Sequence, residues 1–262
     1  MTTLTLAVAD SATMLRRSLR HMLRYPGLTL LLIGMPIVFL MLFVYIFGGT
    51  LGNGLGGSGG RAAYLNYVTP GIILMTIASS SQGTAISVAK DMTEGIIARF
   101  RTMAIARSSV LTGHVIGDLI KSMITTVIIF AVALLIGFRP NATAVEWLAA
   151  IGVLAMFAYA LTWLTVALGL AAKTVEAASN YPMPLVFLPF LGSGFVPTDS
   201  LPTVVCWFAE YQPFTPAIET VRGLLMGTPI GNSALLTVAW CAGIALVGYL
   251  WSKRLYRRDP SR

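Results

Sequence analysis

Charged residues are scarce in this sequence: Asp, Glu, Lys and Arg together make up 11% of the 262 residues, while 56% are hydrophobic. Soluble domains carry about 25% charged residues, so this deficit excludes an ordinary water-soluble globular protein. The few charges are also clustered, which leaves long uncharged stretches between them. The composition therefore predicts a chain that lies largely within a lipid bilayer.

Cysteine and nucleotide-binding motifs are scarce as well. Cys206 and Cys241 match no metal-binding or redox spacing, so we expect both to pack as small apolar residues. No G-x-x-x-x-G-K-[ST] phosphate loop occurs. Gly52, Gly54 and Gly57 match G-x-G-x-x-G, but they stand between two expected membrane spans and not between a strand and a helix. We therefore expect this chain to bind no nucleotide, metal or other cofactor of its own.

Side chains suited to catalysis or ion coupling are also few. His21 and His114 lack metal-ligand spacing, and we expect both near one face of the membrane. The middle of every expected span lacks a carboxylate, the group that proton and cation relays normally use. These absences argue against the two alternatives that we keep, an ion-coupled secondary transporter and a membrane-embedded transferase.

Long apolar stretches dominate what is present. A helix needs roughly 20 apolar residues to cross a 30 Å hydrocarbon core. The expected spans cover approximately 28–47, 68–89, 115–138, 147–172, 181–196 and 234–251. We place Pro70 in the first turn of the second span, and Pro182, Pro184 and Pro189 are expected to make the fifth span irregular. The predicted fold class is an all-α integral membrane protein with six transmembrane helices.

The positive charge is distributed unequally between the two sides of this topology. All but three of the 18 Lys and Arg residues fall in segments on one side, and the exceptions are Arg61, Arg139 and Arg222. The positive-inside rule then predicts a multi-pass protein of the inner (cytoplasmic) membrane with both termini in the cytoplasm. The basic residues set topology and contact anionic membrane lipids. No nucleic acid is expected, because no basic cluster is interleaved with exposed aromatic residues.

The segment before the first span is amphipathic. Residues 12–25 carry an apolar stripe, which predicts a helix that lies in the membrane interface. Its interfacial anchors are Arg16, Arg17, Arg20 and Arg24. The chain thus divides into a cytoplasmic N-terminus with this helix, a transmembrane domain and a basic cytoplasmic tail, over residues 1–27, 28–252 and 253–262.

The connection between the second and third expected spans, residues 91–113, also has a helical pattern. Apolar residues recur at i, i+4, i+8 and i+11 among mixed charges, which predicts a short amphipathic helix. Such a helix can dock onto a soluble partner or lie on the membrane surface. The residues available for docking are Asp91, Glu94, Arg99, Phe100, Arg101 and Arg107.

Residues 201–225 form neither a clean span nor a plain loop. A short apolar run is followed by two prolines and by three charged residues, Glu210, Glu219 and Arg222. The run is too short to span a bilayer, so we predict a re-entrant outer element before the last span. Arg222 is expected near the outer interface, where it can pair with Glu219 one turn earlier. This pair is either purely structural or part of an exit gate.

Three stretches resemble the ABC type-2 transporter permeases, particularly the daunorubicin-resistance-like drug exporter subunits. They comprise residues 91–119 with Glu94-Gly95 and Arg99-Phe100-Arg101, residues 194–202, and residues 212–227. The order of the expected elements agrees too, so the resemblance covers nearly the whole chain. One departure lies in the first stretch, where relatives often carry Pro and then Ser before the Arg, and this chain has Ala104 and Ala106.

This resemblance implies a transporter permease that is not itself an enzyme and that pairs with a separate ATP-binding subunit. ATP and Mg would be bound by that partner, and two permeases, a homodimer, would combine with two such subunits. The helix in residues 91–113 would be the coupling helix. The cargo, a hydrophobic drug, lipid or glycan, would leave outward.

Overall fold

The computed structural model describes residues 26–54, 59–93, 107–198 and 202–257, and the regular secondary structure within these ranges is helical. The expected interfacial helix with Arg16, Arg17, Arg20 and Arg24 lies outside the described residues, as does the end of the basic tail. The first described helix, α2 (Pro26–Leu42), continues through a π-helical turn, η1 (Phe43–Phe47), into α3 (Gly48–Asn53). The remaining elements are α4 (Gly60–Thr93), α6 (Arg107–Ile136), α7 (Ala144–Ala171), α8 (Val175–Asn180), α9 (Met183–Phe187), the 3-10 helix η2 (Leu188–Leu191), α10 (Thr203–Tyr211), α11 (Phe214–Met226) and α12 (Ser233–Arg257).

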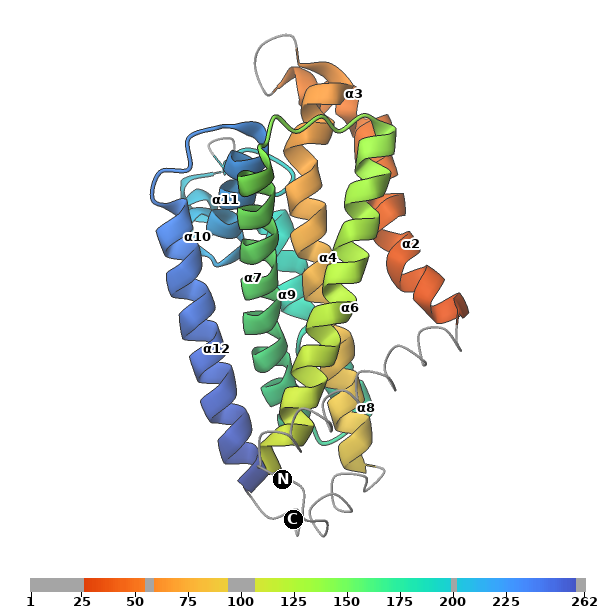
Figure 1. Cartoon of the computed structure of the whole chain (residues 1–262), viewed down its shortest axis with the longest axis vertical. Helices are drawn as coiled ribbons and strands as arrows, with labels where there is room; N and C mark the ends of the chain where they lie inside the picture. The colour runs from red at the N-terminus through yellow and green to blue at the C-terminus, as the bar shows by residue number, and fades with distance from the viewer. Residues whose placement is uncertain (1–25, 55–58, 94–106, 199–201, 258–262) are drawn as a thin grey trace.

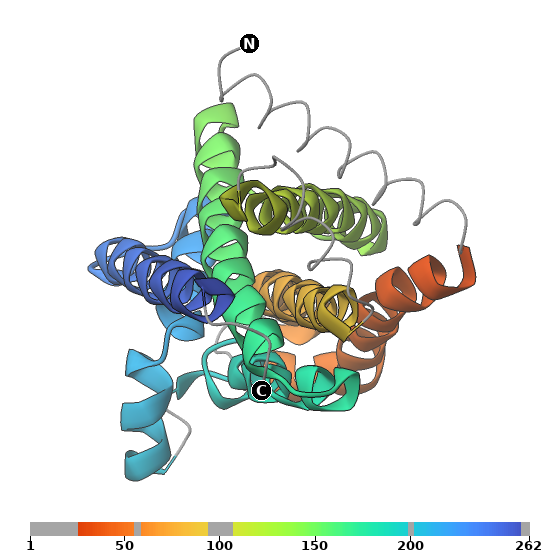
Figure 2. The ribbon, with the colours of Figure 1, turned by 90° about the horizontal axis from the view of Figure 1, so that it is seen from below.

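Five helical stretches in the described residues are long and apolar enough to cross a membrane. They lie side by side along the long axis of the molecule, with α4, α6 and α7 in the middle and with α2 and α12 on opposite edges (Figures 1 and 2). The end of α4, the start of α6 and the end of α12 share the lower end of the molecule in Figure 1, whereas α3 and α11 lie at the upper end. The first four long helices therefore alternate in direction, whereas α7 and α12 both run toward the lower end, with residues 172–232 between them.

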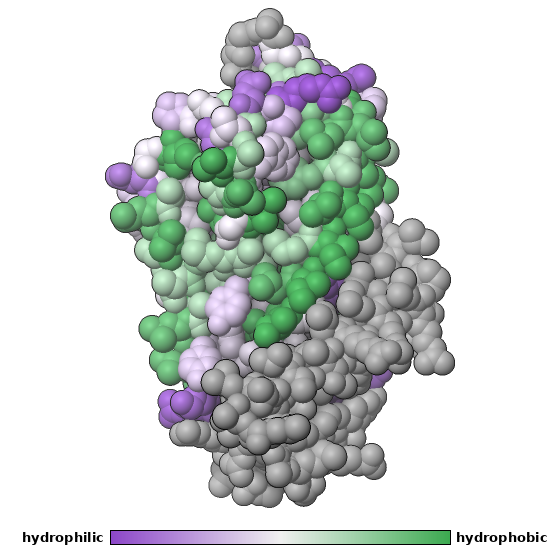
Figure 3. All heavy atoms as spheres, in the orientation of Figure 1, coloured by the Kyte–Doolittle hydropathy of each residue, from purple (hydrophilic) through white to green (hydrophobic). Residues whose placement is uncertain are grey.

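The surface matches a lipid environment. Apolar side chains cover the face in Figure 3 between a hydrophilic rim at the top and a hydrophilic patch at the lower end. Among them, Leu135 is 87% exposed and Leu148 is 70% exposed. Exposure of this extent would be unfavourable in water, because burial of such a side chain contributes about 1.5–3 kcal/mol. In hydrocarbon it carries no such penalty.

The interior consists of a main apolar core and a smaller apolar cluster at the lower end. The main core centres on the packing of α4 against α7, where Tyr64, Ile72, Phe157 and Leu161 are almost completely buried together with Phe214 of α11. The smaller cluster joins α4, α6, α7 and α12, and its buried members are Val88, Leu111, Val115, Trp163, Val166 and Tyr256.

The predicted loop after the first span is partly helical, which corrects the expectation for residues 48–60. The helix continues to Asn53, and α4 begins at Gly60 and not near Val68. The glycines allow this fold, because a Cβ added at Gly52 would lie 2.0 Å from the carbonyl oxygen of Gly60. The glycine pattern therefore permits two backbones to touch.

The early start of α4 also corrects the expected position of Pro70, which lies inside the helix and not in its first turn. A proline there removes the hydrogen bond to the carbonyl four residues earlier and favours a local bend. At the other end of the connection, α6 begins at Arg107, so residues 107–113 belong to a span that was expected to start near Val115.

The fourth expected span, 147–172, begins three residues after the start of α7 at Ala144, and the capping of α7 explains this difference. Thr143 and Glu146 form a capping box, in which the backbone N–H of Thr143 donates to Glu146 Oε2 at 2.6 Å and that of Glu146 donates to Thr143 Oγ1 at 3.4 Å. These bonds satisfy N–H groups at the helix start. A search for uncharged windows excludes Glu146 and therefore misses the first turn.

The fifth expected span is a series of short pieces, as its prolines predicted. The pieces α8, α9 and η2 follow one another from the lower end of α4 toward α11. In place of a continuous ladder of hydrogen bonds, the segment uses contacts with α4 and α11.

Candidate functional site

Two of the residues predicted for coupling lie in described helices, at the lower ends of α4 and α6. Asp91 lies in the last turn of α4, and Arg107 is the first residue of α6. Glu94, Arg99, Phe100 and Arg101 lie outside the described residues, so their docking role stays a prediction. The structure nevertheless fixes the two helices on which the connection 94–106 begins and ends.

A polar contact joins these two helices near the connection. His114 Nε2 of α6 lies 3.1 Å from Asp91 Oδ2 of α4, in the geometry of an ion-pair contact and not of an aligned hydrogen bond. His114 was expected at the membrane face. It instead lies between helices with an 18% exposed side chain.

Most hydroxyl groups of α4 form hydrogen bonds within their own helix. Thr69, Thr76, Ser79, Ser81 and Ser87 each donate to the carbonyl four residues earlier, at 2.6–3.0 Å. Such bonds satisfy a hydroxyl without a partner on another helix.

Two other polar side chains of α4 reach neighbouring elements. Ser80 Oγ donates to Asp118 Oδ1 of α6 at 3.1 Å. Gln82 Nε2 donates to the carbonyl oxygen of Ser179 in α8 at 2.7 Å. These two residues therefore give α4 specific polar contacts on two sides.

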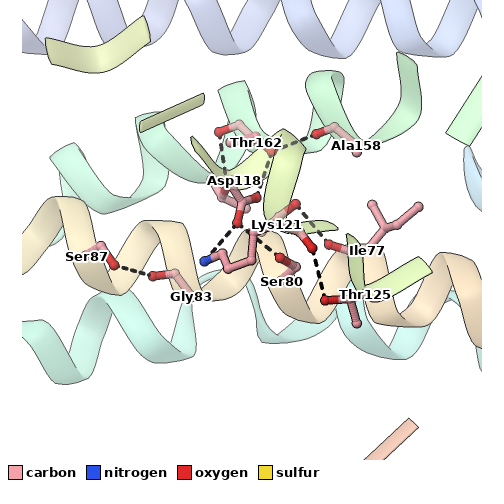
Figure 4. A network of polar contacts seen from close by, with 11 residues as sticks. Ile77, Ser80, Gly83, Ser87, Asp118, Lys121, Thr125, Ala158 and Thr162 are labelled. Carbon is pink, nitrogen blue, oxygen red and sulfur yellow. Dashed lines mark hydrogen bonds and ion pairs between the residues drawn. The ribbon is translucent and has the colours of Figure 1, made fainter. Parts of the chain in front are cut away.

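Asp118 is the centre of a network that joins α4, α6 and α7 (Figure 4). Besides the hydroxyl of Ser80, its carboxylate accepts a hydrogen bond from Thr162 Oγ1 of α7 at 3.0 Å. Lys121 Nζ, one turn further along α6, lies 3.3 Å from Asp118 Oδ1. Thr162 Oγ1 also lies 2.7 Å from the carbonyl oxygen of Ala158, so its single proton can serve either acceptor.

Asp118 is a buried carboxylate that the sequence analysis did not select, and it lies near the start of its span and not in the middle. Asp118 is 2% exposed within a helical stretch, Leu111–Ile136, that is long enough to span. The sequence search missed it because Lys121, only three residues later, made the charged group look like the edge of the span. An acidic and a basic residue at i and i+3 within an apolar run is the signal that could have found it.

The buried carboxylate of Asp118 does not by itself support the alternative of an ion-coupled secondary transporter. Lys121 places a tethered positive charge beside Asp118, so the pair is neutral as a unit. Among the described residues, no group of three or more His, Cys, Asp or Glu side chains has the arrangement of a metal site. The network can therefore hold helices together, but it offers no evident cation site.

At the opposite end, Arg222 of α11 joins three segments. Its Nη2 donates to the carbonyl oxygens of Tyr67 at 3.1 Å and of Ser193 at 2.6 Å, and its Nε donates to that of Tyr67 at 3.3 Å. The guanidinium carbon also lies 3.8 Å from the centre of the Tyr67 ring. Pro70 removes the helix hydrogen bond to the Asn66 carbonyl, so Arg222 binds the carbonyl next to it in the same turn of α4.

The two predicted carboxylate partners of Arg222 lie elsewhere. Glu219 accepts a hydrogen bond from Ser233 Oγ at 2.9 Å, so the expected pair with Arg222 is replaced by a contact between α11 and the start of α12. Glu210 is exposed on α10, where its Oε1 lies 3.7 Å from Cys206 Sγ. The sequence analysis selected Arg222, but it expected Glu219 as the partner in place of the two backbone carbonyls.

A buried glutamine that the sequence analysis did not select completes the outer arrangement. Gln212 lies between α10 and α11, and its Nε2 donates to the carbonyl oxygen of Leu188 in η2 and to Thr215 Oγ1, both at 3.1 Å. Its Oε1 accepts from the backbone N–H of Phe214 at 3.3 Å. Gln212 thus fixes the broken segment against α11. The two helices α10 and α11 stand where a re-entrant element was predicted.

Comparison with known proteins agrees with this arrangement. The family model described as "ABC-2 type transporter" matches residues 11–226. A daunorubicin resistance ABC transporter permease protein of Streptomyces coeruleorubidus is 27% identical over 252 residues, which cover 96% of this chain and 87% of that protein.

Two further relatives match over shorter stretches. A probable doxorubicin resistance ABC transporter permease protein of Mycobacterium tuberculosis is 24% identical over 180 residues, or 69% of this chain and 65% of that protein. Nodulation protein J of Rhizobium leguminosarum is 26% identical over 230 residues, or 84% of this chain and 85% of that protein. Since the family model matches most of the sequence and the described residues form a bundle of apolar helices, the chain belongs to the ABC-2 type transporter family as an integral membrane permease.

Proposed function

We propose that the chain is the membrane-spanning permease subunit of an ATP-driven exporter and pairs with a separate ATP-binding subunit. The observation that carries this proposal is the family match over residues 11–226 in a sequence that has no phosphate loop. A permease without its own nucleotide site requires a partner that binds ATP and Mg. Two permeases and two ATP-binding subunits would form the complete transporter.

The proposal includes six membrane crossings. The five long helices are supplemented by the segment 175–196, whose short pieces α8, α9 and η2 extend along α4 toward α11. Broken backbone is tolerated at membrane depth where protein covers it. Contacts of Gln82 with Ser179 and of Gln212 with Leu188 hold the two ends of this segment against α4 and the start of α11.

The lower end of the molecule in Figure 1 would face the cytoplasm, in the inner membrane of the cell. Lys90, Lys173, Lys253 and Arg254 belong to described segments at or near that end, and the positive-inside rule assigns such an end to the cytoplasm. The connection 94–106 would then face the ATP-binding subunit and act as the coupling helix.

The cargo would be a hydrophobic molecule that moves outward. Two relatives are named for daunorubicin and doxorubicin resistance, which favours a hydrophobic drug over a lipid or a glycan chain for this permease as well. The exposed apolar surface gives a second copy of the chain or lipid room to pack on the bundle. A homodimer with the cargo path between the two copies is the arrangement that we propose.

Replacement of Phe100 by Ala tests the partner. A buried aromatic anchor at an interface contributes about 2 kcal/mol or more, so Phe100→Ala should reduce co-purification with the ATP-binding subunit about 30-fold or more in affinity. Membrane insertion should remain unchanged. The measurement is the yield of the complex in detergent, with ATP-dependent uptake of daunorubicin into inverted vesicles as the second readout.

Val145→Ala is the control, because Val145 is an exposed apolar residue at the start of α7, at the other end of the molecule from the connection. It should retain the complex. Full complex yield and full ATP-dependent export in Phe100→Ala would contradict the assigned coupling role.

A further inference from the structure

Four polar residues of α6 recur at every fourth position. They are His114, Asp118, Ser122 and Thr126, and an i, i+4 spacing places side chains above one another on one face. Asp118, Ser122 and Thr126 are only 2%, 1% and 3% exposed, so they face protein and not lipid. A buried polar stripe on a membrane helix is costly and requires an explanation.

The upper part of this stripe lacks partners. The hydroxyl oxygens of Ser122 and Thr126 are buried and, within the described part of the chain, have no hydrogen-bond partner. Buried polar atoms in native proteins are nearly always paired. One and two turns lower on the same stripe, Asp118 and His114 contact α4, and Asp118 also bonds to α7.

The two helices that face this stripe, α4 and α7, carry hydroxyl side chains both beside Asp118 and one turn lower. On α4, Ser80 lies beside Asp118, and Thr84 is one turn lower and 3% exposed. On α7, Thr162 lies beside Asp118, and Thr165 is about one turn lower and completely buried. Both helices run downward in Figure 1, whereas α6 runs upward.

A downward displacement of α6 by one turn would therefore give both Asp118 and Ser122 hydroxyl partners on the facing helices. Asp118 would come level with Thr84 and Thr165, and Ser122 would take its place between Ser80 and Thr162. Thr162 would also retain an acceptor, because its hydroxyl lies 2.7 Å from the carbonyl oxygen of Ala158 on its own helix.

Two features assign this displacement to α6 and not to its neighbours. A Cβ added at Gly169 of α7 would lie 2.6 Å from the carbonyl oxygen of Ala85 in α4, so these two helices touch backbone to backbone and hold a fixed register. By contrast, α6 begins at Arg107, directly after the connection 94–106. A force on that connection would act along the axis of α6.

We propose that α6 shifts along its axis by about one helical turn, or 5.4 Å, relative to α4 and α7 during transport. Asp118 is the positioning residue that exchanges hydroxyl partners between the two registers, and Ser122 gains partners in the second register. This inference rests on the proposed function, because an ATP-binding subunit supplies the force.

Spin-label distances in the assembled transporter test the shift. Both native cysteines are replaced by Ala, and labels are placed at Ser87 of α4 and Val127 of α6, which are exposed. We expect the distance between them to shorten by about 5 Å when ATP and vanadate are added. The reference pair, Ser87 with Ile151 of α7, should keep its distance.

The unpaired hydroxyls give a second readout. The double variant Ser122→Ala/Thr126→Val removes two buried groups without partners, so the thermal unfolding midpoint should rise. Because the second register loses its polar contacts, the fraction of shifted complexes should fall about fivefold or more. Thr125→Val is the matched control, because its hydroxyl already bonds to the carbonyl of Lys121 at 3.0 Å, and it should shift as the parent does.

Three results would overturn the shift. The first is an unchanged α4–α6 distance in a complex that hydrolyses ATP. The second is a full shift in Ser122→Ala/Thr126→Val. The third is failure of the parent chain to bind any ATP-binding subunit, which contradicts the proposed function itself and is recognised by the absence of a complex.

Discussion

At the scale of single residues, several glycines lie where two backbone segments pack directly against each other. Gly71 of α4 faces Gly194, and a Cβ added at Gly71 would lie 2.4 Å from the Gly194 carbonyl oxygen and 2.8 Å from its Cα. Since both atoms belong to the backbone, no side-chain rotation can relieve the clash. The contact brings the segment after η2 against the middle of the bundle.

Substitution of Gly71 by Ala should therefore destabilise the protein by about 1–3 kcal/mol, the cost of overpacking. Gly83→Ala on the same helix is the control, because no atom lies within 4 Å of its added Cβ. That change should stabilise by about 0.5–1 kcal/mol through helix propensity. Thermal unfolding in detergent measures both, and equal midpoints for the two variants would refute the packing argument.

Arg222 provides the second residue-level prediction. Arg222→Ala leaves the carbonyls of Tyr67 and Ser193 without their donor, which should cost about 1–3 kcal/mol and lower the amount of folded protein. The stability of Arg222→Lys should be intermediate, because the compact Lys ammonium keeps the positive charge but cannot reproduce the planar fork of donors of the guanidinium. Expression level and unfolding midpoint are the measurements. Normal folding of Arg222→Ala combined with reduced export would instead indicate an exit gate.

At the scale of elements, the broken segment depends on side chains that replace helix hydrogen bonds. Gln212 uses both its donor and its acceptor group for this purpose, between η2 and α11. Gln212→Leu keeps a similar volume but leaves the Leu188 carbonyl and the Phe214 N–H unpaired. We expect a loss of about 1–3 kcal/mol.

Glu210→Gln is the control for that variant, because Glu210 is exposed on the neighbouring α10. It should change the unfolding free energy by less than about 0.5 kcal/mol. A Gln212→Leu protein that unfolds with the same midpoint as the control would show that η2 is held in another way.

The existence of the long helices could be predicted from the sequence, because a helix that crosses a bilayer requires a long uncharged apolar stretch. Helix boundaries were less so: Glu146 was placed outside the fourth expected span, although a capping box places it in the first turn of α7. The partner of Arg222 could not be predicted, because backbone carbonyls carry no sequence signal. The network around Asp118 could not be predicted either, because its members Ser80, Lys121 and Thr162 lie on three different helices.

At the scale of the whole molecule, the charge pattern and the helix directions make a single prediction about orientation. In a chain with Cys206→Ala and Cys241→Ala, a cysteine at position 145 should react with a membrane-impermeant maleimide in intact cells. Val145 is 74% exposed at the upper end of α7. A cysteine at position 98 should react only after permeabilisation. Reaction at position 98 in intact cells would reverse the assigned topology.

The hydroxyls of α4 have a consequence for how this helix can diverge among relatives. Thr69, Thr76 and Ser81 use their donors on carbonyls of their own helix, so evolution can exchange them for alanine without changing which helices α4 recognises. Ser80 and Gln82 lack this freedom, because each donates its hydrogen bond to another element. From Thr69 to Ser87, α4 thus carries its choice of polar partner at Ser80 and Gln82, and exchange of Thr69, Thr76 or Ser81 should be nearly neutral.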